Sequence, residues 1–107
     1  MTRAVVFRPA ARLELKSAVE WYEQRSPELG TRLARAVDRL VDRIALNPKL
    51  FAVAYRGVRQ ARVRGFPFAL YFQEMNDQLI VLTILHTSRD PRTWMNSVDD
   101  ELPDESQ

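Results

Sequence analysis

His86 is the only histidine of this chain, and it stands where a long apolar run, Leu79–Leu85, ends. A histidine exchanges protons near neutral pH and can serve as a general acid or base. At the end of a buried strand it can equally be a packed, hydrogen-bonded group. Ser88 lies two residues further on, but no G-x-S-x-G nucleophile motif surrounds it. We therefore expect the structural role before the catalytic one.

A cluster of arginines precedes that run: Arg56, Arg59, Arg62 and Arg64 fall within nine residues. Guanidinium groups present a fork of donors that matches phosphate or carboxylate oxygens. Alternation along a strand puts Arg62 and Arg64 on one face and Arg59 on the other. The cluster predicts a site for an anionic partner, although charges on an edge strand can also serve only to prevent aggregation.

A second series of arginines recurs at helical spacing, and it consists of Arg32, Arg35, Arg39 and Arg43. Two aspartates, Asp38 and Asp42, each stand three residues after one of these arginines, a spacing that allows ion pairs on a helix. We interpret this series as an ordinary solvated helix face.

The composition argues against several classes of chemistry. The chain has no cysteine, which rules out disulfides and thiolate chemistry and makes a reducing cytoplasm the expected location. With a single histidine and no cysteine we expect no metal site, and with only three glycines and no phosphate-binding loop we expect no cofactor. The longest apolar run, "LIVLTIL", has seven residues, whereas a bilayer span needs about 20, so we expect neither a membrane segment nor a signal peptide.

A short strand at Ala4–Arg8 and a first helix are expected at the N-terminus. Pro9 suits the first turn of a helix, where its missing N–H costs nothing. From Ala11 to Tyr22, apolar residues recur with the period of an amphipathic helix, which should end near Arg25.

A second helix should follow the short joint "RSPELG", with Ser26 as its cap and Pro27 at its first position. Asn47-Pro48 should end it. Because the joint is short, the two helices should form an antiparallel hairpin. The apolar stripe of this second helix consists of Leu29, Leu33, Val37, Leu40, Val41 and Ile44.

Three strand-like runs, residues 58–64, 68–74 and 79–86, complete the domain, and their short connections predict an antiparallel meander. The fold class is therefore α+β, in the order β-α-α-β-β-β, with the helical hairpin on one face of an antiparallel sheet. The last run is apolar on both faces, and one hairpin covers only one face, so we expect a partner chain on the other. The aromatic residues of these runs are expected in the core: Phe66, Phe68, Tyr71 and Phe72.

Charge is distributed unevenly along the 107 residues. Residues 1–64 hold 14 of the 16 basic residues and 6 of the 14 acidic ones, whereas residues 99–107 hold five acidic residues and no basic one. We expect one domain over residues 1–98, followed by an acidic, flexible tail over residues 99–107. A basic body favours an acidic partner, either nucleic acid or an acidic protein segment.

Three stretches, "VVFRPAARLEL", "VRQARVRGFPFALYF" and "VLTILHTSRDPRTW", follow one another in an order and spacing that is more specific than any one of them. Together they resemble the ParE-type toxins of the RelE/ParE superfamily, the toxic halves of type II toxin–antitoxin modules. The resemblance covers about residues 4–95, and the expected order of helices and strands agrees with that superfamily.

The resemblance implies a toxin that inhibits growth by poisoning DNA gyrase, without being an enzyme. It also implies a cognate antitoxin that neutralises the toxin by laying its C-terminal segment along it, in a hetero-oligomeric complex. Nucleic acid would be contacted only through the antitoxin or the target. The sequence contains no helix-turn-helix with a recognition face, which disfavours a DNA-binding protein.

The alternative is a ribosome-dependent, mRNA-cleaving ribonuclease of the RelE type. Such an enzyme needs an acid or base near its C-terminus, but the last tyrosine is Tyr71, and the indole of Trp94 exchanges no proton near neutral pH. His86 is the group that could substitute.

Under the resemblance, the residues expected to contact target or antitoxin are Arg56, Arg59, Arg62, Arg64, Tyr71, His86, Arg89 and Trp94. If the chain is a ribonuclease instead, the catalytic candidates are Arg59, Arg62, Arg64, His86 and Arg89. We expect the terminal cluster to act first as a structural lock that ties the C-terminus to the last strand. That cluster consists of His86, Arg89, Asp90 and Trp94.

Overall fold

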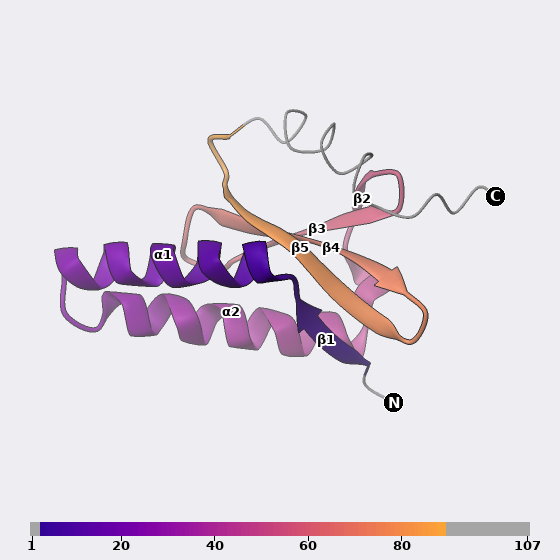
Figure 1. Ribbon diagram of the computed structural model, residues 1–107, viewed down its shortest axis with the longest axis horizontal. Coiled ribbons are helices and arrows are strands. Elements are labelled where there is room, and N and C mark those ends of the chain that lie inside the picture. Colours follow the sequence, from indigo (N-terminus) through magenta and orange to yellow (C-terminus); the bar gives the residue numbers. More distant parts are fainter. Residues whose placement is uncertain (1–2, 90–107) are drawn as a thin grey trace.

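Two long helices lie against one face of a five-stranded sheet in the computed structural model, which describes residues 3–89 (Figure 1). The α+β class and the helical hairpin are both as predicted. The elements are β1 (Ala4–Phe7), α1 (Pro9–Arg25), α2 (Leu29–Leu46), a short 3-10 helix η1 (Pro48–Leu50), β2 (Val53–Tyr55), β3 (Val58–Arg62), β4 (Phe68–Met75) and β5 (Gln78–His86).

The strands are arranged in the order β1-β5-β4-β3-β2. Strands β3, β4 and β5 form the predicted antiparallel meander. Two details differ from the prediction: β1 pairs with β5 in parallel, and β2 is an additional, three-residue edge strand. A short connection dictates antiparallel pairing only between consecutive strands, and the long stretch of chain between β1 and β5 imposes no such constraint. Very short edge strands such as β2 carry too little pattern to be read from sequence.

Strand β5 contains a bulge that changes which side chains share a face. Opposite Tyr71–Phe72 of β4, it carries one extra residue, Leu82. Beyond the bulge, Ile84 faces the helices, and so does His86, whereas Ile80 and Leu82 face the opposite side. Simple alternation along a strand would place all four on one face, but a bulge shifts the period by one residue and turns Ile80 and Leu82 to the other side.

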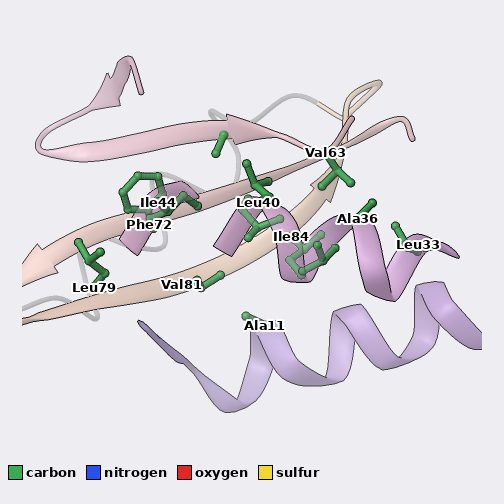
Figure 2. Close-up of a cluster of buried hydrophobic side chains, with 13 residues drawn as sticks. Ala11, Leu33, Ala36, Leu40, Ile44, Val63, Phe72, Leu79, Val81 and Ile84 are labelled. Carbon is green, nitrogen blue, oxygen red and sulfur yellow. The ribbon is translucent and has the colours of Figure 1, made fainter. Parts of the chain in front are cut away.

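The main core lies between the helices and the sheet (Figure 2). Helix α2 supplies the largest share, through buried residues at intervals of four, three and four: Leu33, Val37, Leu40 and Ile44. This stripe is the one predicted from the sequence. Phe72 of β4 meets it from the sheet together with Leu79 and Val81 of β5 (Figure 2). By contrast, α1 buries only Ala11 completely, so α2 anchors the hairpin.

A second apolar cluster lies on the opposite face of the sheet and consists of Val58, Ala69, Tyr71, Leu82 and Leu85. Tyr71 is only 3% exposed and Leu82 only 2%. The prediction that β5 is covered on both faces is therefore confirmed. Tyr55 of β2 packs against this cluster, so part of the cover comes from the chain itself. The expectation that a partner chain lies on this face stays a prediction.

The joint between the helices is built differently from the predicted cap. Helix α2 begins at Leu29, so Ser26 and Pro27 lie in the turn before it. Its first N–H groups are satisfied by the carboxylate of Glu23 in α1, which accepts three backbone hydrogen bonds, the shortest from Gly30 at 2.8 Å. A carboxylate at a helix N-terminus both caps it and complements its dipole.

Gly30 also allows the two helices to approach closely. A Cβ built on Gly30 would lie 2.4 Å from the carbonyl oxygen of Val19 in α1. No larger residue fits there without moving the backbone of α1 relative to α2, so this glycine fixes the geometry of the hairpin.

Candidate functional site

Four arginines converge on a hollow between α2 and β3. Arg39 and Arg43 stand one turn apart on α2, while Arg62 ends β3 and Arg64 follows it. The hollow has a volume of about 170 Å³ and an apolar floor. Its lining consists of Ala36, Arg39, Leu40, Arg43, Arg62 and Arg64. We call it the arginine groove.

The positive charges of the arginine groove are not neutralised within the part of the chain that the structure describes. None of its four arginines forms an ion pair with any residue from 3 to 89. The pairing that the spacing of Asp38 and Asp42 allowed is not formed. Arg43 instead lies over the ring of Phe51, 5.5 Å from its centroid. Four neighbouring guanidinium groups repel one another, and an anion with several acceptor oxygens relieves that repulsion.

The other two arginines of the predicted cluster lie elsewhere. Arg59 donates from Nη1 to the backbone oxygen of Phe51 at 2.6 Å, so its charge ties β3 to the segment before β2. Arg56 occupies the β2–β3 turn with a φ of 40°, beside Gly57. The structure therefore brings two of the four predicted arginines together with two helix arginines that we had interpreted as a solvated face.

A larger pocket opens between α1 and the end of β5, with a volume of about 430 Å³. We call it the α1–β5 pocket. Leu13 and Trp21 at its rim are 65% and 48% exposed, so it presents apolar surface to the outside. The side chains that line it are Leu13, Glu14, Ser17, Ala18, Trp21, Phe68, Ile84, Leu85, His86 and Arg89. Two of the predicted site residues, His86 and Arg89, are thus found here and not in the arginine groove.

The ring of His86 is held by its own turn. Its Nδ1 accepts a hydrogen bond from the backbone N–H of Ser88 at 3.1 Å and lies 2.7 Å from the hydroxyl oxygen of the same residue. The ring stands edge-on to Phe68, with centroids 5.4 Å apart. These contacts are those of a structural group at the end of β5. The remaining members of the expected lock, Asp90 and Trp94, lie outside the described residues, as does the boundary expected at residue 98.

Glu14 is a site residue that the sequence interpretation missed. Its Oε1 accepts hydrogen bonds from the hydroxyl of Thr83 at 2.7 Å and from the backbone N–H of Ile84 at 3.1 Å. Strand β1 pairs with β5 only as far as Val81, so Glu14 satisfies the edge that β1 leaves open. The signal was present, because Glu14 follows Ala11 by three residues and therefore lies on the inward side of α1.

His86 and the arginine groove lie at the same end of the sheet but on different strands. His86 of β5 is the cross-strand neighbour of Phe68 in β4, and Arg62 of β3 is the cross-strand neighbour of Ala69, the next residue of β4. Two strand spacings separate their backbones by about 10 Å. Phe68 stands between them and packs with Tyr22 at 6.1 Å between ring centroids. Among the described residues, the groove lining contains no histidine, carboxylate or tyrosine, and its guanidinium groups can bind an anion.

Tyr71, another predicted contact residue, is placed in the interior. Its hydroxyl accepts a hydrogen bond from Nε2 of Gln60 at 2.9 Å, and its ring belongs to the second apolar cluster. It supports the sheet and presents no surface to a partner. Among residues 3–89, no group of three or more histidine, aspartate or glutamate side chains could hold a metal ion, and no helix is long and apolar enough to cross a membrane.

Residues 5–91 match the family described as the ParE toxin of the type II toxin–antitoxin system, parDE. The chain belongs to this family. The match spans both helices and all five strands, including the arginine groove and the α1–β5 pocket, and it confirms the resemblance seen in the sequence. It makes the chain a toxin of a type II toxin–antitoxin system. No curated protein matches the sequence.

Solved structures share the fold of this ParE-family toxin at low sequence identity. The chromosomal ParDE toxin–antitoxin system from P. aeruginosa superposes with a TM-score of 0.70 at 17% identity, covering 79% of this chain and 96% of that one. A free mutant of the E. coli toxin RelE gives 0.69 at 15% identity, covering 95% and 100%. The toxin–antitoxin complex RelBE2 from Mycobacterium tuberculosis gives 0.58 at 20% identity, covering 80% and 99%.

Proposed function

We propose that this ParE-family toxin arrests growth by binding and poisoning DNA gyrase, and that the arginine groove is part of its contact surface. The observation that carries the proposal is the composition of the groove: four guanidinium groups, with no acid or base among the described residues that line it. Such a surface binds phosphate or carboxylate through charge-assisted hydrogen bonds. Its described lining holds no group that could accept or return a proton, which RNA cleavage requires.

A ribonuclease of the RelE type is the second candidate, and one observation favours it. His86 is exposed and lies at the same end of the sheet as Arg62 and Arg64. Its Nδ1, however, is engaged by Ser88, and two strand spacings separate its backbone from that of Arg62 by about 10 Å. A substrate that spans both places would be needed.

A cognate antitoxin is proposed as the neutralising partner, in a hetero-oligomeric complex. The support is the family, together with the likeness to the P. aeruginosa toxin–antitoxin system and to the M. tuberculosis toxin–antitoxin complex. The α1–β5 pocket suits an apolar helix or strand of such a partner, since exposed Leu13 and Trp21 border it. An acidic part of the same partner suits the arginine groove.

The proposal is tested with purified protein in a gyrase supercoiling and DNA-cleavage assay. The wild-type chain should inhibit supercoiling and accumulate cleaved DNA, and the double variant Arg62→Ala/Arg64→Ala should lose most of this effect. Arg32→Ala/Arg35→Ala is the matched control, because these two arginines lie on α2 but do not line the groove. In cells, expression should stop growth and induce a DNA damage response while messenger RNA stays intact.

The same experiment can overturn the proposal. Messenger RNA cut within codons on ribosomes, with His86→Ala abolishing the cuts, would establish the ribonuclease and make His86 its acid–base group. Unaltered gyrase activity with intact messenger RNA would rule out both candidates and leave a ParE-family toxin with another target.

A further inference from the structure

Residues 3–89 carry a net positive charge, and residues 90–107 carry a net negative charge. Residues 3–89 contain 15 basic and 8 acidic residues, a net charge of +7, and the four groove arginines concentrate part of this excess in one hollow. Residues 90–107 contain one basic and six acidic residues, a net charge of −5, and five of those acids fall within residues 99–107. The chain thus carries its own acidic segment beside an arginine site that no acid from 3 to 89 neutralises.

The connection between the two is long enough for them to meet. Arg89 follows the end of β5, which lies at the same end of the sheet as Arg62, about two strand spacings or 10 Å away. Asp99 stands ten positions after Arg89, and an extended chain covers about 33 Å over ten residue steps. A tether of this length holds a ligand near its site at an effective concentration on the order of millimolar.

We propose that residues 99–107 bind in the arginine groove and act as a built-in competitor of acidic partners. The carboxylates of the segment accept hydrogen bonds from the guanidinium groups of Arg39, Arg43, Arg62 and Arg64. The segment supplies the counter-charge that no acidic residue from 3 to 89 supplies. The proposal goes beyond the proposed function, since it concerns an intramolecular contact and holds whichever target the toxin has.

Such a contact regulates the groove by occupancy. A site whose free form is only a fraction of the population binds an external ligand more weakly by that fraction. If the segment fills the groove half to nine-tenths of the time, removing it tightens binding of an acidic probe about twofold to tenfold. Because the contact is between exposed charges, the effect is largest at low ionic strength and disappears when salt screens it.

Paramagnetic relaxation on the full chain tests the contact directly. The chain contains no cysteine, so Ser106→Cys allows a single nitroxide label beside the acidic residues. At about 0.02 M salt the label should broaden the backbone amide signals of Arg62 and Arg64, and at about 0.5 M salt it should not. The amide of Asp77 in the β4–β5 turn is the internal control, roughly 23 Å further along β4. Equal signals in both regions at low salt would overturn the proposal.

Two further samples test whether the contact depends on the acidic side chains and stays within one chain. Neutralising the segment (Asp99→Asn, Asp100→Asn, Glu101→Gln, Asp104→Asn and Glu105→Gln) should abolish the broadening, and persistent broadening would show that the contact is not the proposed one. Mixing the labelled chain with an unlabelled, isotope-enriched chain should give no broadening, and broadening in the mixture would show a contact between chains.

A binding measurement tests the regulatory role. A dye-labelled oligoglutamate peptide should bind the chain lacking residues 99–107 about twofold to tenfold more tightly than the full chain at low salt. At high salt the two affinities should converge. Equal affinity at low salt would contradict the regulatory role.

Discussion

The arginine groove and the α1–β5 pocket both lie where a helix meets the sheet. They differ in how the polar groups that line them are satisfied. In the pocket, Glu14 is bound by Thr83 and Ile84, and the Nδ1 of His86 is bound by Ser88. In the groove, no described side chain supplies a counter-charge to its four arginines. Polar groups that the fold itself satisfies stabilise the fold, whereas charges left without a partner are available to a second molecule.

The difference also separates the candidate roles of the conspicuous residues. The histidine that first suggests catalysis belongs to the region whose hydrogen bonds are internal. The helix arginines that first suggest an ordinary solvated surface belong to the region that is open to a ligand. Substitutions in the pocket should therefore act on stability, and substitutions in the groove on binding.

The largest effect is expected from the helix side of the groove. Arg39→Ala/Arg43→Ala removes two guanidinium groups from the site, and each hydrogen bond from a charged group contributes about 1.5–3 kcal/mol. Binding of an acidic partner or of the gyrase target should weaken by about a hundredfold or more. The free energy of unfolding should fall by no more than about 1 kcal/mol, because both side chains are exposed and the contact of Arg43 with the Phe51 ring contributes about 0.5–1 kcal/mol. Calorimetric titration and denaturant unfolding measure the two quantities.

The matched control for this variant is Arg32→Ala/Arg35→Ala, which removes the same charge from the same helix. If both double variants weaken binding equally, general attraction accounts for the affinity and the groove has no special role. If only Arg39→Ala/Arg43→Ala weakens binding, the groove is the site.

Most of the fold could be predicted because short stretches of the sequence carry clear signals for its helices and strands. Pro9 and Asn47-Pro48 bound the hairpin, and the apolar stripe of α2 has the helical period, so these elements depend on short-range signals. The parallel pairing of β1 with β5 could not be predicted, because it depends on contacts between distant parts of the chain. The bulge at Leu82 and the strand β2 were not predicted for another reason: one extra residue and a strand of three residues leave too little pattern in the sequence.

Only two of the four arginines that line the arginine groove could be predicted as site residues. Arg62 and Arg64 were recognised from their spacing on one strand, but their meeting with Arg39 and Arg43 depends on how α2 packs across β3. Helical spacing alone gives the same pattern for a solvated face and for one wall of a groove. Conversely, Arg59 looked equivalent to its neighbours and is committed to the backbone of Phe51.

Glu14→Ala is expected to give the next largest effect, on stability. It leaves the backbone N–H of Ile84 and the hydroxyl of Thr83 without their acceptor, and an unsatisfied part-buried group costs about 1–3 kcal/mol. The midpoint of urea unfolding should fall, and hydrogen exchange at Ile84 should become faster. Glu20→Ala on the exposed side of α1 is the control and should change neither. Unchanged protection at Ile84 would refute the role assigned to Glu14.

Glu23→Ala should cost about 1 kcal/mol, within the range of about 0.5–2 kcal/mol measured for lost helix caps. Its carboxylate accepts three backbone hydrogen bonds at the start of α2, and alanine replaces none of them. The loss should shrink in high salt, since part of it is the attraction of the carboxylate to the helix dipole. Gln24→Ala, exposed on the same turn of α1, should leave stability unchanged; an equal loss there would point to helix propensity and not to the cap.

The smallest effect is expected from His86→Ala, which distinguishes most directly between a role of the pocket and a role of the groove. The substitution removes an edge-on contact with Phe68 and the hydrogen bond to Ser88, but the ring is exposed, so the free energy of unfolding should fall by only about 0.5–1 kcal/mol. Affinity for the target should stay as in the wild type, because His86 does not line the arginine groove. Thr87→Ala is the neighbouring control, since the N–H that bonds to Pro67 belongs to the backbone and survives the change. If the variant unfolds like the wild type but no longer arrests growth, the functional group is His86 in the pocket and not the arginine groove. That result would favour RNA over gyrase as the target.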